Sequence, residues 1–183
     1  LKIVTQNAYN YEEPVTVGYD IYSPQGKLLE FNMTEITIPG RSTDTVRFSP
    51  FIYHTYKNKW EAGSKTPPLY KVMLFTRRNG VYKEYMPLKI GFGKTELVDG
   101  RLTRFDKELK LVKAGYNAAA DRKTTLAELK TLKAKGNNTI CPDYPQPAWF
   151  YELCDEYGLY VYDEANIESH GMYYDLRKGG TLG

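Results

Sequence analysis

The stretch that decides the fold is residues 159–172, which read Leu-Tyr-Val-Tyr-Asp-Glu-Ala-Asn-Ile-Glu-Ser-His-Gly-Met. Four apolar or aromatic residues follow Gly158 and lead directly into a cluster of carboxylates, an Asn and a His. This pattern is typical of a buried parallel strand that ends in a polar site. In barrels and open α/β sheets, chemistry takes place at that end of the strands. We therefore expect a functional site just after residue 162.

Helix and strand signals alternate in the residues before this stretch. Thr125 and Glu128 have the spacing of a capping box, and Gly136 is a typical helix stop. Pro147 suits the first position of a second helix, which Gly158 ends. The expected elements are strands at 109–112, 138–141 and 159–162 and helices at 125–136 and 147–157. This order predicts right-handed parallel βα units.

Residues 1–96 carry only strand signals. Strands are expected at 15–22, 27–31, 34–38, 43–48, 70–76 and 81–86. The last two are separated by a loop with Asn79-Gly80, a strong short-range signal for a hairpin. About seven short strands with regular turns are typical of an immunoglobulin-like sandwich. A small hairpin around Asp99-Gly100 should lead into the next part, so we expect one domain at 1–96 and a second at 97–183.

The composition excludes several classes of protein. The apolar share of 42% and the charged share of 26% are those of a soluble globular protein. A net charge of +3 without a basic run argues against nucleic acid as a partner. No apolar run approaches the ~20 residues of a membrane span. Cys141 and Cys154 lack metal-site spacing, and we expect Cys154 to be a buried free thiol.

The stretch 149–172 resembles glycoside hydrolase family 2, and within it the β-galactosidases. The family pattern W-Y-x-L-C-D-x-Y-G-L-Y-V-x-D-E-A-N-I-E-x-H-G-M stands here nearly unbroken, with one extra aromatic residue after Trp149. Trp60, Asn79-Gly80 and Gly91-Phe92 also follow the family order, although Gly93 stands where the family has an Arg. The resemblance implies an all-β immunoglobulin-like sandwich followed by an incomplete (β/α)8 TIM-barrel segment.

The resemblance also implies hydrolysis of terminal β-D-galactosides by a retaining mechanism. That mechanism needs two carboxyl groups about 5–5.5 Å apart, and the family motifs that carry them do not occur in this chain. We therefore expect no catalytic residue here and no activity of the chain alone. A complete barrel needs about 250 residues, so the chain is expected to be a piece of a larger, homo-oligomeric enzyme. Without a signal peptide in the sequence, a cytoplasmic or periplasmic location is expected.

The family motifs suggest which residues form a site. Glu168 and His170 match the positions that bind the active-site Mg²⁺, but the third ligand is the missing acid/base glutamate. The candidate substrate-pocket residues are Asn117, Asp143, Tyr144 and Asn166. Other pocket positions differ from the family: Asp143 replaces a His, Ile140 replaces an Arg, and three alanines follow Asn117. Alanines and an apolar residue cannot hold a sugar hydroxyl by hydrogen bonds.

Three hypotheses follow from the sequence. The first is a piece of a β-galactosidase. The second is a catalytically dead carbohydrate-binding or assembly piece. The third is a sister activity of the same family, β-glucuronidase or β-mannosidase; the full N-I-E-x-H-G-M string favours the galactosidase. The altered positions at 118–121 and 139–143 fit either a degenerate relative or an imperfect record of the sequence.

Overall fold

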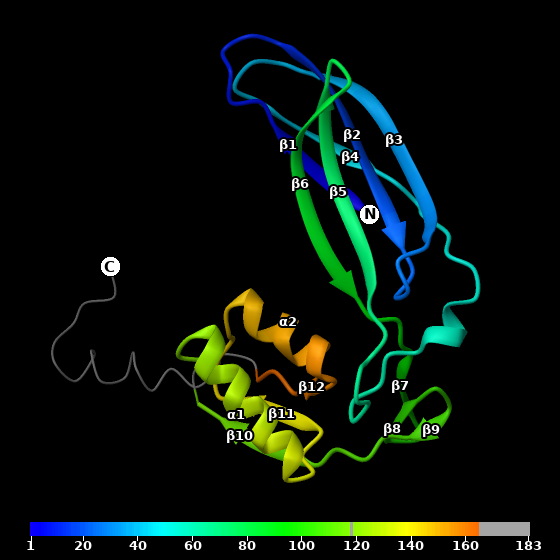
Figure 1. The fold of residues 1–183 in the computed structure, drawn as a ribbon, viewed down its shortest axis with the longest axis vertical. Helices are drawn as coiled ribbons and strands as arrows, with labels where there is room; N and C mark the ends of the chain where they lie inside the picture. The colour runs from blue at the N-terminus through cyan, green and yellow to red at the C-terminus, as the bar shows by residue number, and fades with distance from the viewer. Residues whose placement is uncertain (118, 165–183) are drawn as a thin grey trace, which may run out of the picture. The chain divides into compact units, whose positions relative to one another are not determined.

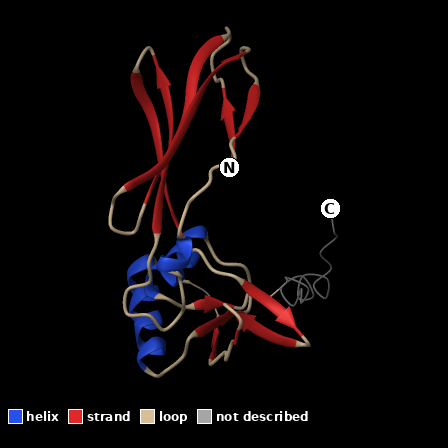
Figure 2. Cartoon of the chain, turned by 90° about the vertical axis from the view of Figure 1, so that its right-hand side faces the viewer, coloured by secondary structure: helices blue, strands red, loops and turns tan. Residues whose placement is uncertain are grey.

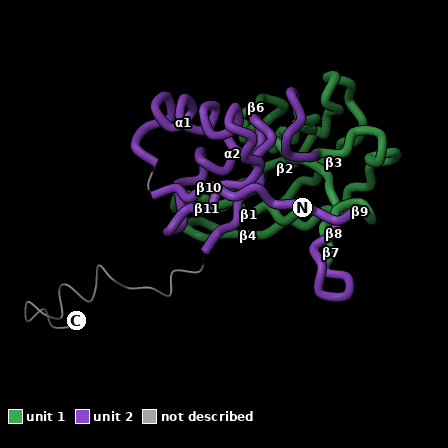
Figure 3. Tube along the Cα trace, turned by 90° about the horizontal axis from the view of Figure 1, so that it is seen from below, with its two compact units in different colours: residues 1–60, 67–96, 104–106 green, residues 61–66, 97–103, 107–183 purple. Residues whose placement is uncertain are grey.

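The structure is a computed structural model that describes residues 1–117 and 119–164. The chain forms two compact units, shown in green and purple in Figure 3. Unit 1 comprises residues 1–60, 67–96 and 104–106, and unit 2 comprises residues 61–66, 97–103 and 107–183. Neither unit is one continuous stretch, because residues 61–66 belong to unit 2 and residues 104–106 to unit 1. The assignment of domains to 1–96 and 97–183 stays a prediction.

Unit 1 is built from antiparallel strands, as the sequence predicted. Its strands are β1 (Lys2–Gln6), β2 (Glu13–Tyr22), β3 (Leu28–Ile38), β4 (Thr43–Arg47), β5 (Tyr70–Arg78) and β6 (Val81–Ile90) (Figure 1). A short 3-10 helix, η1 (Thr55–Asn58), precedes β5. The strands form a four-stranded sheet in the order β3-β2-β5-β6 and a two-stranded sheet of β1 and β4. The predicted β-sandwich sheets are therefore confirmed.

The prediction of two separate strands at 27–31 and 34–38 is wrong, because β3 is one continuous strand. Asn32 and Met33, between the two predicted strands, remain paired with Tyr19 and Gly18 of β2. No Gly or Pro interrupts β3, so nothing in its backbone forces a turn there.

The core of unit 1 lies on one face of the larger sheet. Tyr19, Ile21 and Val72 are almost fully buried, and Phe48 and Ile90 pack against them. Alternate residues of β2 supply this face, as the two-residue period of a strand requires. The β5–β6 hairpin turns at Asn79 and Gly80, whose φ angles of 50° and 75° are those of the turn that Asn-Gly favours. The predicted hairpin is confirmed.

The space beside Gly93 is filled by a side chain from elsewhere in unit 1. A Cβ at Gly93 would lie only 1.9 Å from Nη2 of Arg104. Arg104 donates hydrogen bonds from Nη1 to Oγ1 of Thr95, at 2.7 Å, and from Nη2 to the carbonyl of Trp60. Because residue 93 has no side chain, the Arg104 guanidinium group fits beside it. Its hydrogen bonds connect the segments that carry Trp60, Thr95 and Arg104.

The second part of the chain begins with a small sheet and continues with parallel βα units. The small sheet has the order β7-β8-β9, formed by β7 (Thr95–Val98), β8 (Arg101–Arg104) and β9 (Lys107–Glu108). The units that follow are β10 (Lys113–Tyr116), α1 (Arg122–Ala134), β11 (Thr139–Pro142), α2 (Ala148–Tyr157) and β12 (Tyr160–Val161). β10, β11 and β12 pair in parallel. Both α-helices, drawn in blue in Figure 2, belong to unit 2. The predicted parallel β/α segment is confirmed.

The first parallel strand lies later than predicted. β10 begins at Lys113, whereas the prediction was 109–112. The pairing of Ala114 with Ile140 places Ala114 and Tyr116 against the helices, where they pack on the buried core. The apolar residues Leu109, Leu111 and Val112 misled the prediction, because burial of the strand depends on its register with β11.

The predicted capping box is also wrong. α1 begins at Arg122, with Asp121 as its N-cap. Asp121 Oδ1 accepts hydrogen bonds from the backbone N–H groups of Lys123 and Thr124, at 2.9 and 3.0 Å. Thr125 lies inside the helix and is buried, and Glu128 accepts a hydrogen bond from the Tyr116 hydroxyl instead. A carboxylate is a strong N-cap, so the helix starts at the earlier residue.

The core of unit 2 lies between the helices and the parallel strands. Its buried residues are Leu129, Ile140, Phe150, Leu153, Cys154 and Leu159. Cys154 is a free thiol, as predicted, and burial raises its pKa to about 12. Lys133 ties the segment 61–66 to this core by donating to the carbonyls of Ser64 and Tyr157. No helix in the described part of the chain is long and apolar enough to span a membrane.

Candidate functional site

The candidate site lies at the carboxyl ends of the three parallel strands. Because β10, β11 and β12 run in parallel, the residues that follow them share one edge of the sheet. Asn117 follows β10, and Asp143 and Tyr144 follow β11. The backbone N–H of Asp143 donates to the carbonyl of Tyr116 at 3.0 Å. The fold therefore brings together three of the four predicted pocket residues, and all three are exposed.

Gln146 joins the loops that follow β10 and β11. Its Oε1 accepts a hydrogen bond from the backbone N–H of Ala119 at 2.8 Å. Its Nε2 donates to the carbonyl of Tyr144 at 2.7 Å and lies 3.5 Å from the carbonyl of Asn117. One amide side chain thus satisfies backbone groups of both loops, and this fixes the spacing between Asn117 and Tyr144.

Tyr151 makes the corresponding connection to the end of β12. Its hydroxyl donates to Asp163 Oδ2 at 3.0 Å and accepts from the backbone N–H of Gln146 at 3.0 Å. Burial and the nearby Asp163 carboxylate raise the pKa of Tyr151, whereas the bond from Gln146 lowers it. The chain Gln146–Tyr151–Asp163 therefore links all three strand ends.

The helices pack on one face of the parallel sheet, and a second set of side chains lies on the other face. Side chains alternate along a strand, so Lys113 and Cys141 lie on the face opposite to Ala114 and Ile140. Lys113 Nζ lies 3.9 Å from the centroid of the Tyr162 ring. Burial raises the pKa of the Cys141 thiol, and the Lys113 ammonium group acts in the opposite direction.

Ile140, which stands where the family has an Arg, has no exposed surface. It is fully buried in the core with Leu129 and Phe150. Its apolar side chain therefore packs against the helices. The next residue, Cys141, lies on the opposite face of the strand.

The remaining predicted site residues lie outside the described residues. These are Asn166, Glu168 and His170. Among residues 1–117 and 119–164, no group of three His, Cys, Asp or Glu side chains is arranged to hold a metal ion. The Mg²⁺ site and the pocket roles thus stay predictions.

Sequence reasoning missed Gln146 and Tyr151. Gln146 stands between Pro145 and Pro147, and no motif marks it, because its partners come from a loop far away in the sequence. Tyr151 had a weak signal: it lies one turn into α2, where its side chain points back toward the helix start. Exposed carboxylates, amides and a tyrosine at one edge can hydrogen-bond and stack on a polyhydroxylated ligand.

The comparisons with known proteins agree with this geometry. Residues 115–181 match the family model of the glycosyl hydrolases family 2, TIM barrel domain. Residues 115–181 therefore belong to the barrel domain of glycoside hydrolase family 2, and the chain is related to the β-galactosidases of that family. The chain is 38% identical over 128 residues to the β-galactosidase of Halalkalibacterium halodurans, a match that covers 65% of this chain and 12% of that enzyme. It therefore spans about an eighth of the length of the curated relatives it matches.

Solved structures show the same fold for this chain. A glycosyl hydrolase family 2 member from Bacteroides cellulosilyticus matches with a TM-score of 0.80 and 17% identity, over 96% of this chain and 25% of that one. The Bacteroides uniformis β-glucuronidase 2 matches with a TM-score of 0.74 and 19% identity, over 93% and 22% of the two chains. The resemblance read from residues 149–172 is confirmed at the level of the family.

Proposed function

We propose that this chain forms part of the sugar pocket of a β-galactosidase that hydrolyses terminal β-D-galactosides with retention of configuration. The observation that carries the proposal is the shared edge at which β10, β11 and β12 end in polar loops joined by Gln146 and Tyr151. The 38% identity to a β-galactosidase supports the choice of substrate class.

In this proposal Asn117, Asp143 and Tyr144 contact the sugar. The Asp143 carboxylate accepts hydrogen bonds from sugar hydroxyls, and the Asn117 side chain can both donate and accept. The Tyr144 ring, 40% exposed, offers an apolar face and a polar tip. Asn166 belongs to the same proposal, although it lies outside the described residues.

The chain is proposed to bind and orient the sugar but not to react with it. A retaining hydrolase needs an acid/base and a nucleophile on either side of the glycosidic bond, and the motifs for these two residues are absent from this sequence. Glu168 and His170 are proposed to hold Mg²⁺, which prefers oxygen ligands and would need further ones. We therefore expect no turnover of 4-nitrophenyl β-D-galactoside by the purified 183-residue chain. Turnover that copurifies with the chain would contradict this proposal.

A chimera tests the substrate class. The 128-residue segment of the H. halodurans β-galactosidase that matches this chain is replaced by the corresponding residues of this chain. We expect the chimera to hydrolyse a β-galactoside measurably and to favour it over a β-glucuronide and a β-mannoside. Asp143→Ala in the chimera should raise KM or lower kcat/KM by about tenfold, as expected for a lost charge-assisted hydrogen bond. A folded chimera without activity would favour the catalytically dead alternative, and a preference for the glucuronide would favour the sister activity.

A further inference from the structure

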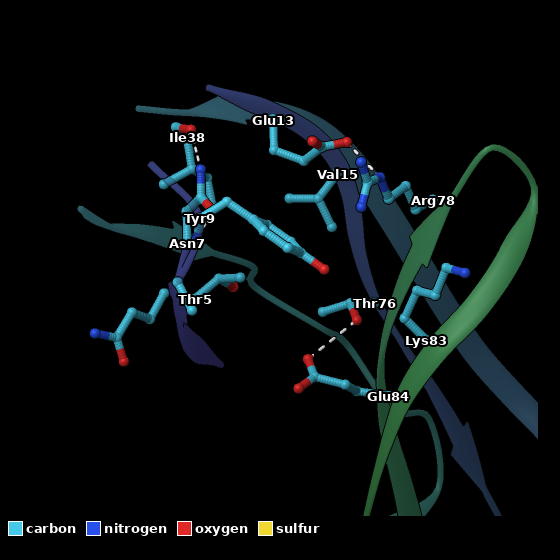
Figure 4. Close-up of a pocket in the computed structure, with 12 residues that line it drawn as sticks. Thr5, Asn7, Tyr9, Glu13, Val15, Ile38, Thr76, Arg78, Lys83 and Glu84 are labelled. Carbon is cyan, nitrogen blue, oxygen red and sulfur yellow. Dashed lines mark hydrogen bonds and ion pairs between the residues drawn. The ribbon is translucent and has the colours of Figure 1, made fainter. Parts of the chain in front are cut away.

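Unit 1 contains a hollow of its own. It has a volume of about 470 Å³ and is lined by the end of β1, the loop that follows it, the last residue of β3, and strands β2, β5 and β6. Figure 4 shows the Tyr9 ring projecting toward its middle, with Glu13 and Arg78 on one side and Thr76 and Glu84 on the other. Small-molecule sites usually occupy roughly 300–1,000 Å³, so the hollow has room for a sugar ring.

The loop that carries Tyr9 is held in place by a buried amide. Asn7 is only 6% exposed, and its Nδ2 donates to the carbonyls of Tyr11 and Ile38, at 2.8 and 2.9 Å. Its Oδ1 accepts from the backbone N–H of Tyr9 at 2.9 Å. At Gly40 the chain passes so close that a Cβ would lie 2.5 Å from the Asn10 backbone. The loop is therefore preorganised, which lowers the entropy lost on binding a ligand.

Tyr9 presents an aromatic surface to the hollow. The side chain is 51% exposed, and its ring stacks on Tyr11 with centroids 5.3 Å apart and an interplanar angle of 20°. The Arg78 guanidinium lies 5.6 Å from the Tyr9 centroid. A fixed, half-exposed ring of this kind is suited to pack against the apolar C–H face of a sugar.

The charges that line the hollow cancel. Glu13 is paired with Arg78, and Glu84 accepts a hydrogen bond from the Thr76 hydroxyl at 3.1 Å. Lys83 also lines the hollow, and in Figure 4 its ammonium group points away from these two carboxylates. With two formal charges of each sign, the hollow offers donors and acceptors but no net field for an ionic ligand. This favours a neutral polyhydroxylated ligand over an anion or a cation.

One hydroxyl in the hollow lacks a protein partner. The Oγ1 atom of Thr5 is buried and makes no hydrogen bond within the described residues, and Thr5 lines the hollow. Leaving a buried polar atom unsatisfied costs about 1–3 kcal/mol. Because this oxygen has almost no exposed surface, a ligand hydroxyl bonds to it, and relieves the penalty, only when a neighbouring side chain of the hollow moves aside. The hollow thus combines a stacking ring, balanced charges and an unused hydroxyl.

We infer that this hollow is a second carbohydrate-binding site, which takes a neutral pyranose sugar through stacking on Tyr9 and hydrogen bonds to Thr5, Glu84 and the Glu13–Arg78 pair. The site shares no residue with the proposed pocket at the strand ends, since all its residues belong to unit 1. Its role is retention of a sugar chain and not hydrolysis.

The test is a titration of the full 183-residue chain with methyl β-D-galactoside and methyl β-D-glucoside, followed by ligand-observed and protein-observed NMR. Saturable millimolar binding is expected for at least one of the two, with shifts at the loop 7–12. Tyr9→Ala should weaken binding at least tenfold, and Thr5→Val, which replaces only the hydroxyl by a methyl group, should weaken it about threefold to tenfold. Tyr53→Ala is the matched control. It should leave sugar binding unchanged, because Tyr53 is 74% exposed and lies outside the hollow.

Several results would overturn the inference. One is the absence of saturable binding of both neutral sugars, and another is unchanged binding in both Tyr9→Ala and Thr5→Val. A third is binding that disappears in Asp143→Ala but persists in Tyr9→Ala, because that would place the sugar at the strand ends of unit 2. If Tyr9→Ala does not fold, Thr5→Val alone decides the question.

Discussion

The two units build their cores from residues at very different separations along the sequence. In unit 2 all six buried core residues come from the continuous stretch between Leu129 and Leu159. In unit 1, Tyr19 and Ile21 pack with Val72 and Ile90 from strands that are distant in the chain. Both units bury large aromatic side chains, Phe150 in unit 2 and Tyr19 and Tyr70 in unit 1, while Phe31 of unit 1 is largely exposed. The core of unit 2 therefore depends on local helix–strand contacts, and the core of unit 1 depends on the pairing of strands that are distant in the sequence.

The largest expected effect is the loss of Phe150. Phe150→Ala removes a side chain with no exposed surface from the centre of the core of unit 2, and such truncations cost about 3–5 kcal/mol. The helical circular dichroism signal, which reports mainly on α1 and α2, should then melt earlier in urea. Phe31→Ala, at a position that is 64% exposed, should change stability by less than about 0.5 kcal/mol.

The chain provides a separate probe for each unit, because Trp60 belongs to unit 1 and Trp149 to unit 2. In the Phe150→Ala variant, we expect the fluorescence of Trp149 to change at lower urea than that of Trp60. Coincident transitions of both tryptophans would show that the units unfold as one, and the contrast between their cores would then have no energetic meaning.

Gly18 and Gly115 allow the tightness of packing to be compared between the sheet of unit 1 and the parallel strands of unit 2. At Gly18 in β2 an added Cβ would lie 2.5 Å from Phe75 and 2.8 Å from the Asn32 carbonyl oxygen. Gly18→Ala should therefore destabilise unit 1 by about 1–3 kcal/mol through overpacking. At Gly115 in β10 no atom lies within 4 Å of an added Cβ, so Gly115→Ala should be neutral or slightly stabilising. Equal melting temperatures of the two variants would argue against this difference in packing.

The smallest expected effect concerns the start of α1. Hydrogen bonds from the Thr124 hydroxyl and backbone N–H, and from the Lys123 N–H, lower the pKa of the Asp121 carboxyl. The ionised cap thus stabilises the fold above its usual pKa, and this contribution is lost as the pH falls through the lowered value. Asp121→Ala should lower the melting temperature of unit 2 by about 2–5 °C at pH 7, with little further change at acidic pH.

Asp121→Asn is the matched control for the cap. An amide can still accept the backbone hydrogen bonds, so this variant should keep most of the stability at pH 7 and lose the acid dependence. Thr125→Ala would have the larger effect if the helix began at the capping box that the sequence suggested. Thermal melts of the three variants at pH 7 and pH 3 separate these two positions of the helix start.

Local signals predicted much of the fold. Asn79-Gly80 predicted a hairpin because the turn needs two residues with positive φ, and both have it. The helices α1 and α2 were predicted from apolar spacing and glycine stops. By contrast, β1 was not predicted, because its five residues are exposed or half-buried and gain their pairing only from β4.

The candidate site was only partly visible in the sequence. Asn117, Asp143 and Tyr144 were found because each follows a strand, and chemistry takes place at strand ends. Gln146 was not found, because its importance depends on two loops that pairing of β10 with β11 brings together. The hollow around Tyr9 was missed for the same reason: its lining comes from five strands and a loop and carries no motif.

The sequence by itself determined the family, the alternation of strands and helices, and the polar residues at the strand ends. These depend on short-range effects, namely turn conformation, side-chain periodicity and a long specific string of residues. Only the tertiary structure decided the register of β10, the true N-cap of α1, the burial of Ile140 and the joining of loops by Gln146. Each of these depends on which distant backbone group a side chain meets, and that is fixed only when the strands have paired and the helices have packed.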